Sequence, residues 1–432
     1  MKPGFYTIMA AQFFSSLADN ALLIAAIALL LDQDAPEALT PMLKFFFTVS
    51  YVVLAPFVGA FADSRPKGTV MFITNLIKIS GCLLMIASEF VSIPGTEDYV
   101  TVLLAYGLVG LGAAAYSPAK YGILTELLPP EKLVVANGWI EGLTVTSIIL
   151  GTVLGGTLIS PRVADFLLSI DLPHIDTGID SAPGAAMIVI CACYVMAAIF
   201  NLFIPDTGVR YKPQATSPVI LVRDFSRCLV ILWKDKLGQI SLAVTTLFWG
   251  AGATLQFIVL KWALQQLDMP LDKGAILQGV VAVGVALGAV LAARFVPLRN
   301  SLKVLPCGVL MGLLVISMVA TRERAVAYPL LVLVGAMAGY FVVPMNALLQ
   351  HRGHVLMSAG HSIAIQNFNE NLNVLVMIGV YSLMLRAELN INTVILIFGT
   401  FVSLTMLLVM MWNRLNNERE DLSHLIGESG HG

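Results

Sequence analysis

Residues 391–411 read INTVILIFGTFVSLTMLLVMM, a stretch without a charged side chain. A second uncharged stretch, residues 99–119, reads YVTVLLAYGLVGLGAAAYSPA. About 20 consecutive apolar residues are enough for an α-helix to cross the hydrocarbon core of a bilayer. Backbone polar groups must be satisfied within such a segment, and the alternation typical of membrane β-barrels is absent. These stretches therefore predict membrane-spanning helices.

The composition of the whole chain agrees with a membrane protein. Of its 432 residues, 58% are hydrophobic and 12% are charged, whereas a soluble globular chain has about 25% charged residues. So few charged side chains cannot cover a soluble protein of this length. The net charge of -2 gives no indication of a nucleic-acid partner. The five cysteines show no CxxC spacing, so we interpret them as packing residues.

The apolar stretches predict an all-α membrane protein with twelve spans. Only four residues precede the first, which contains Asp19 and is too long for the core of a signal peptide. We therefore predict that it is a retained span. The twelve ranges are 5–31, 41–62, 69–92, 99–126, 132–160, 184–204, 238–266, 274–297, 301–320, 326–350, 358–387 and 391–414.

A polar, basic stretch from Pro205 to Lys236 separates two sets of six spans. We divide the chain into an N-terminal six-helix half (1–204), a cytoplasmic linker between the halves (205–237), a C-terminal six-helix half (238–414) and a cytoplasmic tail (415–432). With both termini inside, 16 Lys and Arg residues face the cytoplasm and seven face the other side. Because basic residues concentrate in cytoplasmic loops, we predict this orientation.

The two halves share a weak internal sequence repeat. Tyr116-Ser-Pro-Ala-Lys120 ends the fourth span, and a Tyr/Pro/polar pattern, Tyr340-Phe-Val-Val-Pro-Met-Asn346, lies in the tenth. Two parallel halves of six spans are the architecture of the major facilitator superfamily. Residues 59–68, GAFADSRPKG, resemble that superfamily's signature loop after the second span.

The signature-like loop has a simple physical interpretation. Gly59 permits close helix approach, Asp63 could cap a helix or pair with a basic residue, and Arg65 and Lys67 add cytoplasmic charge. In the superfamily this loop is a cytoplasmic latch between helices, and the alternative is an ordinary short basic loop. The corresponding region of the second half, residues 288–297, lacks the acid.

Ionisable side chains inside spans are the strongest functional signal. A charge at the bilayer centre costs at least roughly 2.5–3.5 kcal/mol and is tolerated where it faces a cavity or a partner. Such residues are Asp19, Lys78, Lys120, Glu141 and Glu370. For Asp19 and Glu370 we favour a cavity role over interhelical bonding. Glu141 could pair with Lys120 or Lys78, and Lys120 could instead extend to the interface.

The eleventh span carries a polar stripe around Glu370. Gln366, Glu370 and Asn373 share one helix face, with Asn367 and Asn371 beside it. For Asn373 we predict a hydrogen bond to a neighbouring helix.

One apparent enzyme motif and one apparent metal motif lack the neighbouring residues that such sites need. Residues 360–364, GHSIA, lack the preceding strand and final glycine of a nucleophile elbow. His351, His354 and His361 have no carboxylate or cysteine placed to complete a metal site. We therefore predict no catalytic residues, no metal and no cofactor.

Blocks from the first to the eleventh span resemble the bacterial lysophospholipid transporter family of this superfamily. The most specific are the block that contains Tyr116 to Lys120 and the block that contains Gln366-Asn367 and Glu370-Asn371. The blocks cover residues 11–23, 55–63, 112–124, 136–141, 247–255, 341–350 and 364–371.

This resemblance implies import of lysophosphatidylethanolamine and related lysolipids from the outer to the inner leaflet of a bacterial inner membrane. It implies alternating access by the two halves, and reacylation by a cytoplasmic acyltransferase. It places Asp19, Lys120 and Glu370 on the transport pathway. Our candidate substrate-binding residues are Asp19, Asn20, Tyr116, Lys120, Gln256, Gln366 and Glu370. Our candidate gating or structural residues are Gly59, Asp63, Arg65, Lys67, Glu141 and Lys261.

One position departs from the family pattern. The family typically has an arginine where this chain has Gln256, and a glutamine cannot neutralise a carboxylate. Lys261 lies five residues on and could partly substitute, although it is not on quite the same face.

Two alternatives to lysolipid transport remain open. One is proton-coupled export of a small amphipathic solute, with Asp19 or Glu370 as proton carrier. The other is a membrane enzyme that acts on lipid.

Overall fold

The computed structural model describes residues 3–35, 39–90, 97–169, 181–212, 217–269 and 271–419. Lys2 and the predicted tail from residue 420 onward lie outside the described residues. In the described ranges, every regular element is helical. The α-helices are α1 (Pro3–Asp32), α2 (Thr40–Val53), α3 (Ala55–Asp63), α4 (Lys67–Ala87), α5 (Asp98–Leu127), α6 (Leu133–Leu158), α7 (Pro161–Leu168), α8 (Ala182–Leu202), α9 (Pro218–Lys234), α10 (Lys236–Gln266), α11 (Leu271–Phe295), α12 (Leu305–Ser317), α13 (Arg324–Leu356), α14 (Ala359–Arg386) and α15 (Ile391–Arg419).

The predicted all-α membrane fold is confirmed. Within the described ranges, eleven helices are long and apolar enough to cross a membrane, and the bent pair α2 and α3 makes twelve if it is one span. This pair is the second predicted span, and it bends by 64° at a break that the sequence analysis did not locate. Pro56 lies in the first turn of α3, where its missing N–H and its ring interrupt a continuous helix.

The chain forms two compact units. The first comprises residues 1–123 and 146–218, and the second comprises residues 124–145 and 219–432. The boundaries therefore run through α5 and α6, and the segment 124–145 belongs with the second unit although it precedes the predicted linker.

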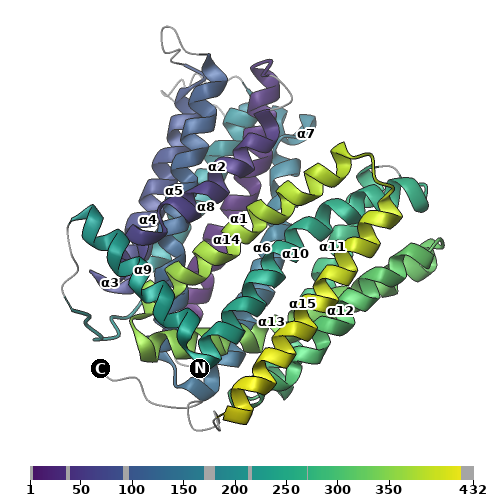
Figure 1. Ribbon diagram of the computed structural model, residues 1–432. Helices are drawn as coiled ribbons and strands as arrows, with labels where there is room; N and C mark the ends of the chain where they lie inside the picture. The colour runs from purple at the N-terminus through teal and green to yellow at the C-terminus, as the bar shows by residue number, and fades with distance from the viewer. Residues whose placement is uncertain are drawn as a thin grey trace. The chain divides into compact units, whose positions relative to one another are not determined.

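In the first unit, small residues bring helix backbones into contact. The α1 helix packs against α8, and α4 packs against α8 (Figure 1). A Cβ atom on Gly151 would lie 2.6 Å from the carbonyl oxygen of Leu17, and one on Gly155 would lie 2.7 Å from that of Ala21. Larger side chains at these two positions would therefore force α6 away from α1.

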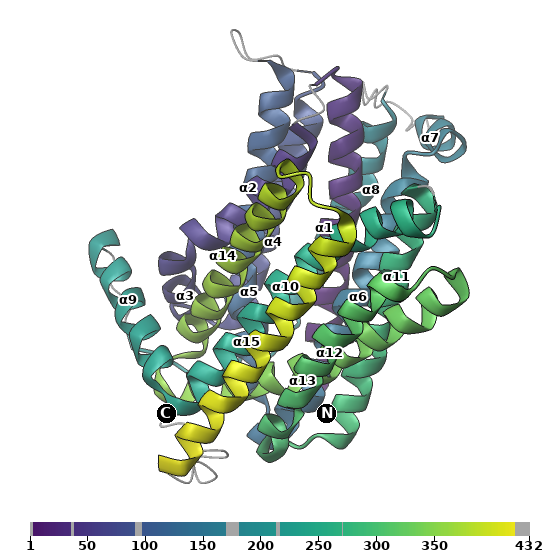
Figure 2. The ribbon, with the colours of Figure 1, turned by 45° about the vertical axis from the view of Figure 1, so that its right-hand side comes forward.

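In the second unit, helices pack in three main pairs. These are α11 with α13, α12 with α15, and α10 with α14. Figures 1 and 2 show α12 and α15 side by side in both views. The predicted linker also contains a helix, α9, which the sequence analysis did not predict.

The corner between α9 and α10 is fixed by Asp235. Its side chain accepts a hydrogen bond of 2.7 Å from the backbone N–H of Gly238 and caps α10. It also accepts a hydrogen bond of 2.7 Å from the guanidinium of Arg352, which is buried. Because both contacts fall on one carboxylate, the end of α9 is held at the start of the α10 span.

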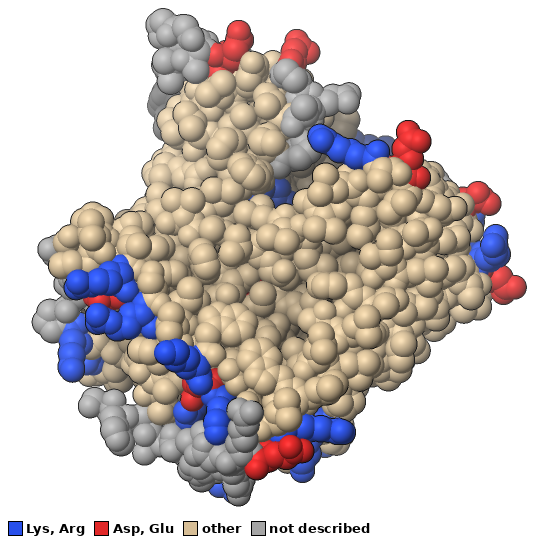
Figure 3. Space-filling view, in the orientation of Figure 1, with Lys and Arg blue, Asp and Glu red and all other residues tan. Residues whose placement is uncertain are grey.

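Charged side chains are sparse over the spans, and Lys and Arg side chains gather over the helix α9. Figure 3 shows a broad uncharged face and a group of Lys and Arg side chains over α9. In the linker before α9, Arg210 forms an exposed ion pair of 2.6 Å with Asp206. This hydrogen-bonded pair, with the backbone N–H of Gly208, lowers the pKa of Asp206 to about 2. Asp206 is therefore ionised at neutral pH.

Candidate functional site

Asp19 of α1 and Lys78 of α4 form an ion pair within the spans of the first unit. The Lys78 ammonium donates to both carboxylate oxygens, at 2.9 Å and 2.7 Å. The sequence analysis singled out both residues but considered Glu141, not Asp19, as a partner for Lys78. That pairing was one of two left open, and the structure instead gives the Lys78 ammonium the Asp19 carboxylate.

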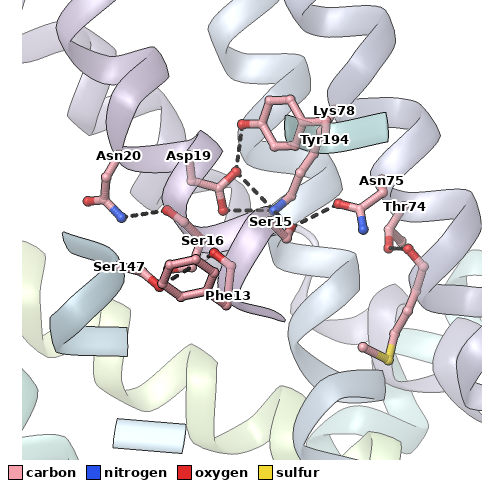
Figure 4. A network of polar contacts seen from close by, with 11 residues as sticks. Phe13, Ser15, Ser16, Asp19, Asn20, Thr74, Asn75, Lys78, Ser147 and Tyr194 are labelled. Atoms are coloured by element: carbon pink, nitrogen blue, oxygen red, sulfur yellow. Dashed lines mark hydrogen bonds and ion pairs between the residues drawn. The ribbon is translucent and has the colours of Figure 1, made fainter. Parts of the chain in front are cut away.

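Further polar side chains fix the ion pair from both sides, as Figure 4 shows. The Tyr194 hydroxyl of α8 donates to the Asp19 carboxylate at 2.7 Å. On the other side, the Lys78 ammonium donates to the Ser15 hydroxyl at 3.0 Å, and Ser15 donates to the Asn75 amide oxygen at 2.9 Å. The cluster therefore joins α1, α4 and α8.

The two charges of this pair differ in exposure. The side chain of Lys78 is 2% exposed, whereas that of Asp19 is 20% exposed. The rings of Tyr116 and Tyr194 lie 5.1 Å and 5.7 Å from the Lys78 ammonium, within the range of cation–π attraction. The pair is thus enclosed on the lysine side and open on the carboxylate side.

A glycine makes room for the Lys78 stem. A Cβ atom on Gly112 of α5 would lie 2.8 Å from Cγ of Lys78 and 2.9 Å from the backbone oxygen of Thr74. Only a residue without a side chain lets α5 approach α4 at this level while Lys78 reaches Asp19.

The other candidates of the first unit are Asn20, Tyr116 and Lys120. The Asn20 amide donates to the Ser16 carbonyl of its own helix at 2.8 Å and turns away from Lys78 (Figure 4). Tyr116 is buried, and its hydroxyl has no hydrogen-bond partner among the described residues. The Lys120 ammonium lies 4.2 Å from the centre of the Tyr121 ring.

A second polar cluster lies inside the second unit. Gln366 donates to the Glu370 carboxylate at 2.7 Å and to the Asn346 amide oxygen at 3.0 Å. Asn346 in turn donates to the Glu141 carboxylate at 3.3 Å. Both glutamates are buried. Two carboxylates from α14 and α6 are therefore connected through amides of α14 and α13.

A pair of amides bonds α6 to α13 near this cluster. Asn137 donates to Gln350 at 2.9 Å, and Gln350 donates back to Asn137 at 2.9 Å. Both side chains are buried. The sequence analysis did not single out this pair.

Two further residues, one on α14 and one on α10, form hydrogen bonds to neighbouring helices. The Asn373 amide donates to the Thr246 carbonyl of α10 at 2.8 Å, which is the interhelical bond expected for this residue. Gln256 of α10 donates to the Gln278 side chain of α11 at 2.9 Å. Gln256 is exposed and Lys261 is half-buried.

The signature-like loop holds a buried ion pair. The Lys67 ammonium lies 2.6 Å from the Asp63 carboxylate and donates to the Ala62 carbonyl at 2.9 Å. It also lies 4.8 Å from the centre of the Tyr211 ring. Arg65 is exposed, whereas Gly59 is buried. Asp63 thus pairs with a basic residue, and its role as a latch stays a prediction.

Comparison with known proteins places the chain in a family. The family model of the Major Facilitator Superfamily matches residues 8–376. The lysophospholipid transporter LplT of Yersinia enterocolitica serotype O:8 is 40% identical over 388 residues, covering 89% of this chain and 88% of that protein. LplT of Photorhabdus laumondii is 38% identical over 412 residues, covering 95% and 96%. This chain belongs to the lysophospholipid transporter family of the superfamily.

A solved structure supports the fold of this family member. The bacterial homologue of the iron transporter ferroportin, in an outward-facing state, matches with a TM-score of 0.72 at 14% identity. The match covers 97% of this chain and all of the other.

The structure adds residues that are not among the candidate site residues predicted from the sequence. Tyr194, Ser15 and Asn75 complete the Asp19 cluster, and Asn346 connects the two glutamates. Asn346 lay in a quoted family block, but a single amide in a span is more often an interhelical contact. Tyr194 gave no signal because tyrosine is an ordinary residue in membrane helices.

Proposed function

We propose that the chain is a lysophospholipid transporter of the bacterial inner membrane, with both termini in the cytoplasm. By alternating access it moves lysophosphatidylethanolamine and related lysolipids from the outer to the inner leaflet, where a cytoplasmic acyltransferase reacylates them. Relatives named for lysophospholipid transport, about 40% identical over most of the chain, support this proposal. The observation that carries it is the Asp19–Lys78 pair inside the spans.

The chemistry of the pair matches a zwitterionic headgroup. Asp19 offers an anion for the ethanolamine ammonium, and Lys78 offers a cation for the phosphate. Breaking a buried pair is unfavourable mainly because it leaves a charge uncompensated. A zwitterion supplies both opposite charges at once, so the headgroup replaces each partner. Because Asp19 is the more exposed member, the ammonium makes the first contact in this scheme.

Within this proposal, the buried glutamate network supplies a second set of polar contacts. Gln366 and Glu370 lie one turn apart on α14, and Gln366 already donates a hydrogen bond of 2.7 Å to Glu370. The Gln366 amide oxygen is buried without a partner among the described residues. It is therefore available to accept a hydrogen bond from a hydroxyl or ammonium of the substrate.

Uptake of labelled lysophosphatidylethanolamine by spheroplasts tests the proposal. We expect Asp19→Asn and Lys78→Gln to lower the uptake rate at least tenfold, because each leaves one headgroup charge without its partner. Asp206→Asn is the matched control, since it removes a charge from an exposed ion pair outside the spans. Wild-type uptake in both site variants would refute the assignment of the site.

The partly exposed Asp19 and the buried Glu370 also suit a proton carrier, which keeps proton-coupled export of an amphipathic solute as the alternative. Reconstituted vesicles with and without a pH gradient separate the two functions. Lysolipid movement that is unaffected by the gradient supports lysolipid transport. Movement that depends on the gradient and disappears in Asp19→Asn or in Glu370→Gln supports the alternative.

A further inference from the structure

The helix α9 has one face packed on the second unit, of which it is part, and a wide face that no described residue of that unit covers. Phe225 and Leu232 are buried, and the Phe225 ring contacts the Phe368 ring of α14 edge to face at 5.4 Å. The helix has 17 residues, which is about 25 Å of length. Its orientation is further fixed at its end, where Asp235 binds Arg352.

Basic residues form a ridge along the uncovered face. Arg223, Arg227 and Lys234 are exposed, and spacings of four and seven residues place them on one side of the helix. The helix contains a single acid, Asp224, which lies 3.8 Å from Arg227. Such a weak exposed contact contributes little, so the ridge keeps a positive charge.

Apolar side chains flank the basic ridge. Val219, Val222 and Val230 are 77%, 45% and 49% exposed, and Ile220 and Ile231 are each 38% exposed. Trp233 is half-buried on the same side as Val222. A ridge of basic residues with apolar flanks fits the surface of an anionic bilayer. There the charged ends of Lys and Arg side chains contact lipid phosphates, and the apolar side chains enter the acyl region.

The connection to α10 places α9 at this boundary. One residue, Asp235, separates Lys234 from the start of α10. The α10 span has 31 residues, or about 46 Å, which exceeds a hydrocarbon core of about 30 Å. The first turns of α10 therefore reach the headgroup region, and α9 ends there.

We propose that α9 is a surface-bound helix that binds anionic phospholipids of the cytoplasmic leaflet through Arg223, Arg227 and Lys234. Each basic residue near an anionic surface contributes roughly fivefold to binding. An acidic protein would suit the ridge but not the apolar flanks. This inference is independent of the transported substrate.

Tryptophan quenching by brominated lipids tests the inference with the full chain in vesicles. The signal of Trp233 is the difference between wild type and Trp233→Phe. We expect brominated phosphatidylglycerol to quench this signal at least twofold more than brominated phosphatidylcholine does. The excess should disappear in the variant R223Q/R227Q/K234Q and persist in Arg210→Gln, a linker control outside α9.

Salt provides a measurement that leaves the basic ridge unchanged. At about 1 M salt the Debye length falls to about 3 Å, so the excess quenching should shrink in the wild type. Equal quenching by the two lipids would overturn the inference. No quenching of Trp233 by either lipid would also overturn it and indicate a protein partner. Lysolipid transport is measured separately in the same vesicles. Failure of the proposed transport function can therefore be distinguished from failure of α9 to bind anionic lipid.

Discussion

At the residue scale, the ion pair of Asp19 and Lys78 combines stability with function. Both charges lie within spans, and the pair is enclosed by Tyr194 and Tyr116. Removing one partner of a buried pair leaves the other uncompensated, whereas removing both leaves only polar or apolar packing. A stability measurement therefore separates the structural contribution of the pair from its proposed role in transport.

We expect Lys78→Met alone to lower the stability of the purified protein by up to about 3–5 kcal/mol, because it leaves the Asp19 carboxylate uncompensated. The double variant Asp19→Asn with Lys78→Met should recover most of that stability without recovering lysolipid uptake. Thermal unfolding in detergent and spheroplast uptake check the two parts. A double variant as unstable as the single one would contradict this account.

The two members of the pair also show how far residue-level prediction extends. Asp19 and Lys78 stand out because charged side chains are rare in spans. Their mutual contact does not follow from that, since 59 residues separate them. Tyr194 lies 175 residues from Asp19, and no local pattern marks it as a partner.

At the element scale, α6 and α13 are joined by polar contacts rather than by apolar packing alone. Asn137 and Gln350 exchange two hydrogen bonds, and Asn346 reaches Glu141 one turn further along α6. Segment 124–145 of α5 and α6 belongs to the second unit, and these contacts join it to α13 there. Hydropathy predicted these helices well, but it gives no information on which helices pair or where α2 and α3 bend.

A double-mutant cycle on Asn137 and Gln350 measures this connection. Interhelical hydrogen bonds in membranes contribute about 0.6 kcal/mol each on average, so two reciprocal bonds predict a coupling energy of about 1 kcal/mol. The single variants Asn137→Ala and Gln350→Ala and the double variant are compared by thermal unfolding. Asn373→Ala with Gln350→Ala serves as the control pair, and it should be additive. A coupling energy near zero for the first pair would show that the amides do not join the helices.

At the scale of the whole molecule, orientation is the property that the proposed function most needs. In the orientation of the proposed function, the loop with Asp63 and Lys67 and the helix α9 face the cytoplasm. The family and the number of spans could be predicted from the sequence because hydropathy and motif spacing are properties of the chain itself. The orientation depends instead on the distribution of Lys and Arg among the loops, and its prediction calls for a direct test.

Cysteine labelling with a membrane-impermeant maleimide tests the orientation. Ser64 and Glu388 are exposed and lie in loops on opposite predicted sides. The native cysteines are buried or half-buried, so the wild type serves as the background. We expect Ser64→Cys to be labelled in inside-out vesicles and Glu388→Cys in spheroplasts, because the basic loops stay in the cytoplasm. The reverse pattern would place α9 and the signature-like loop outside and would contradict the predicted orientation.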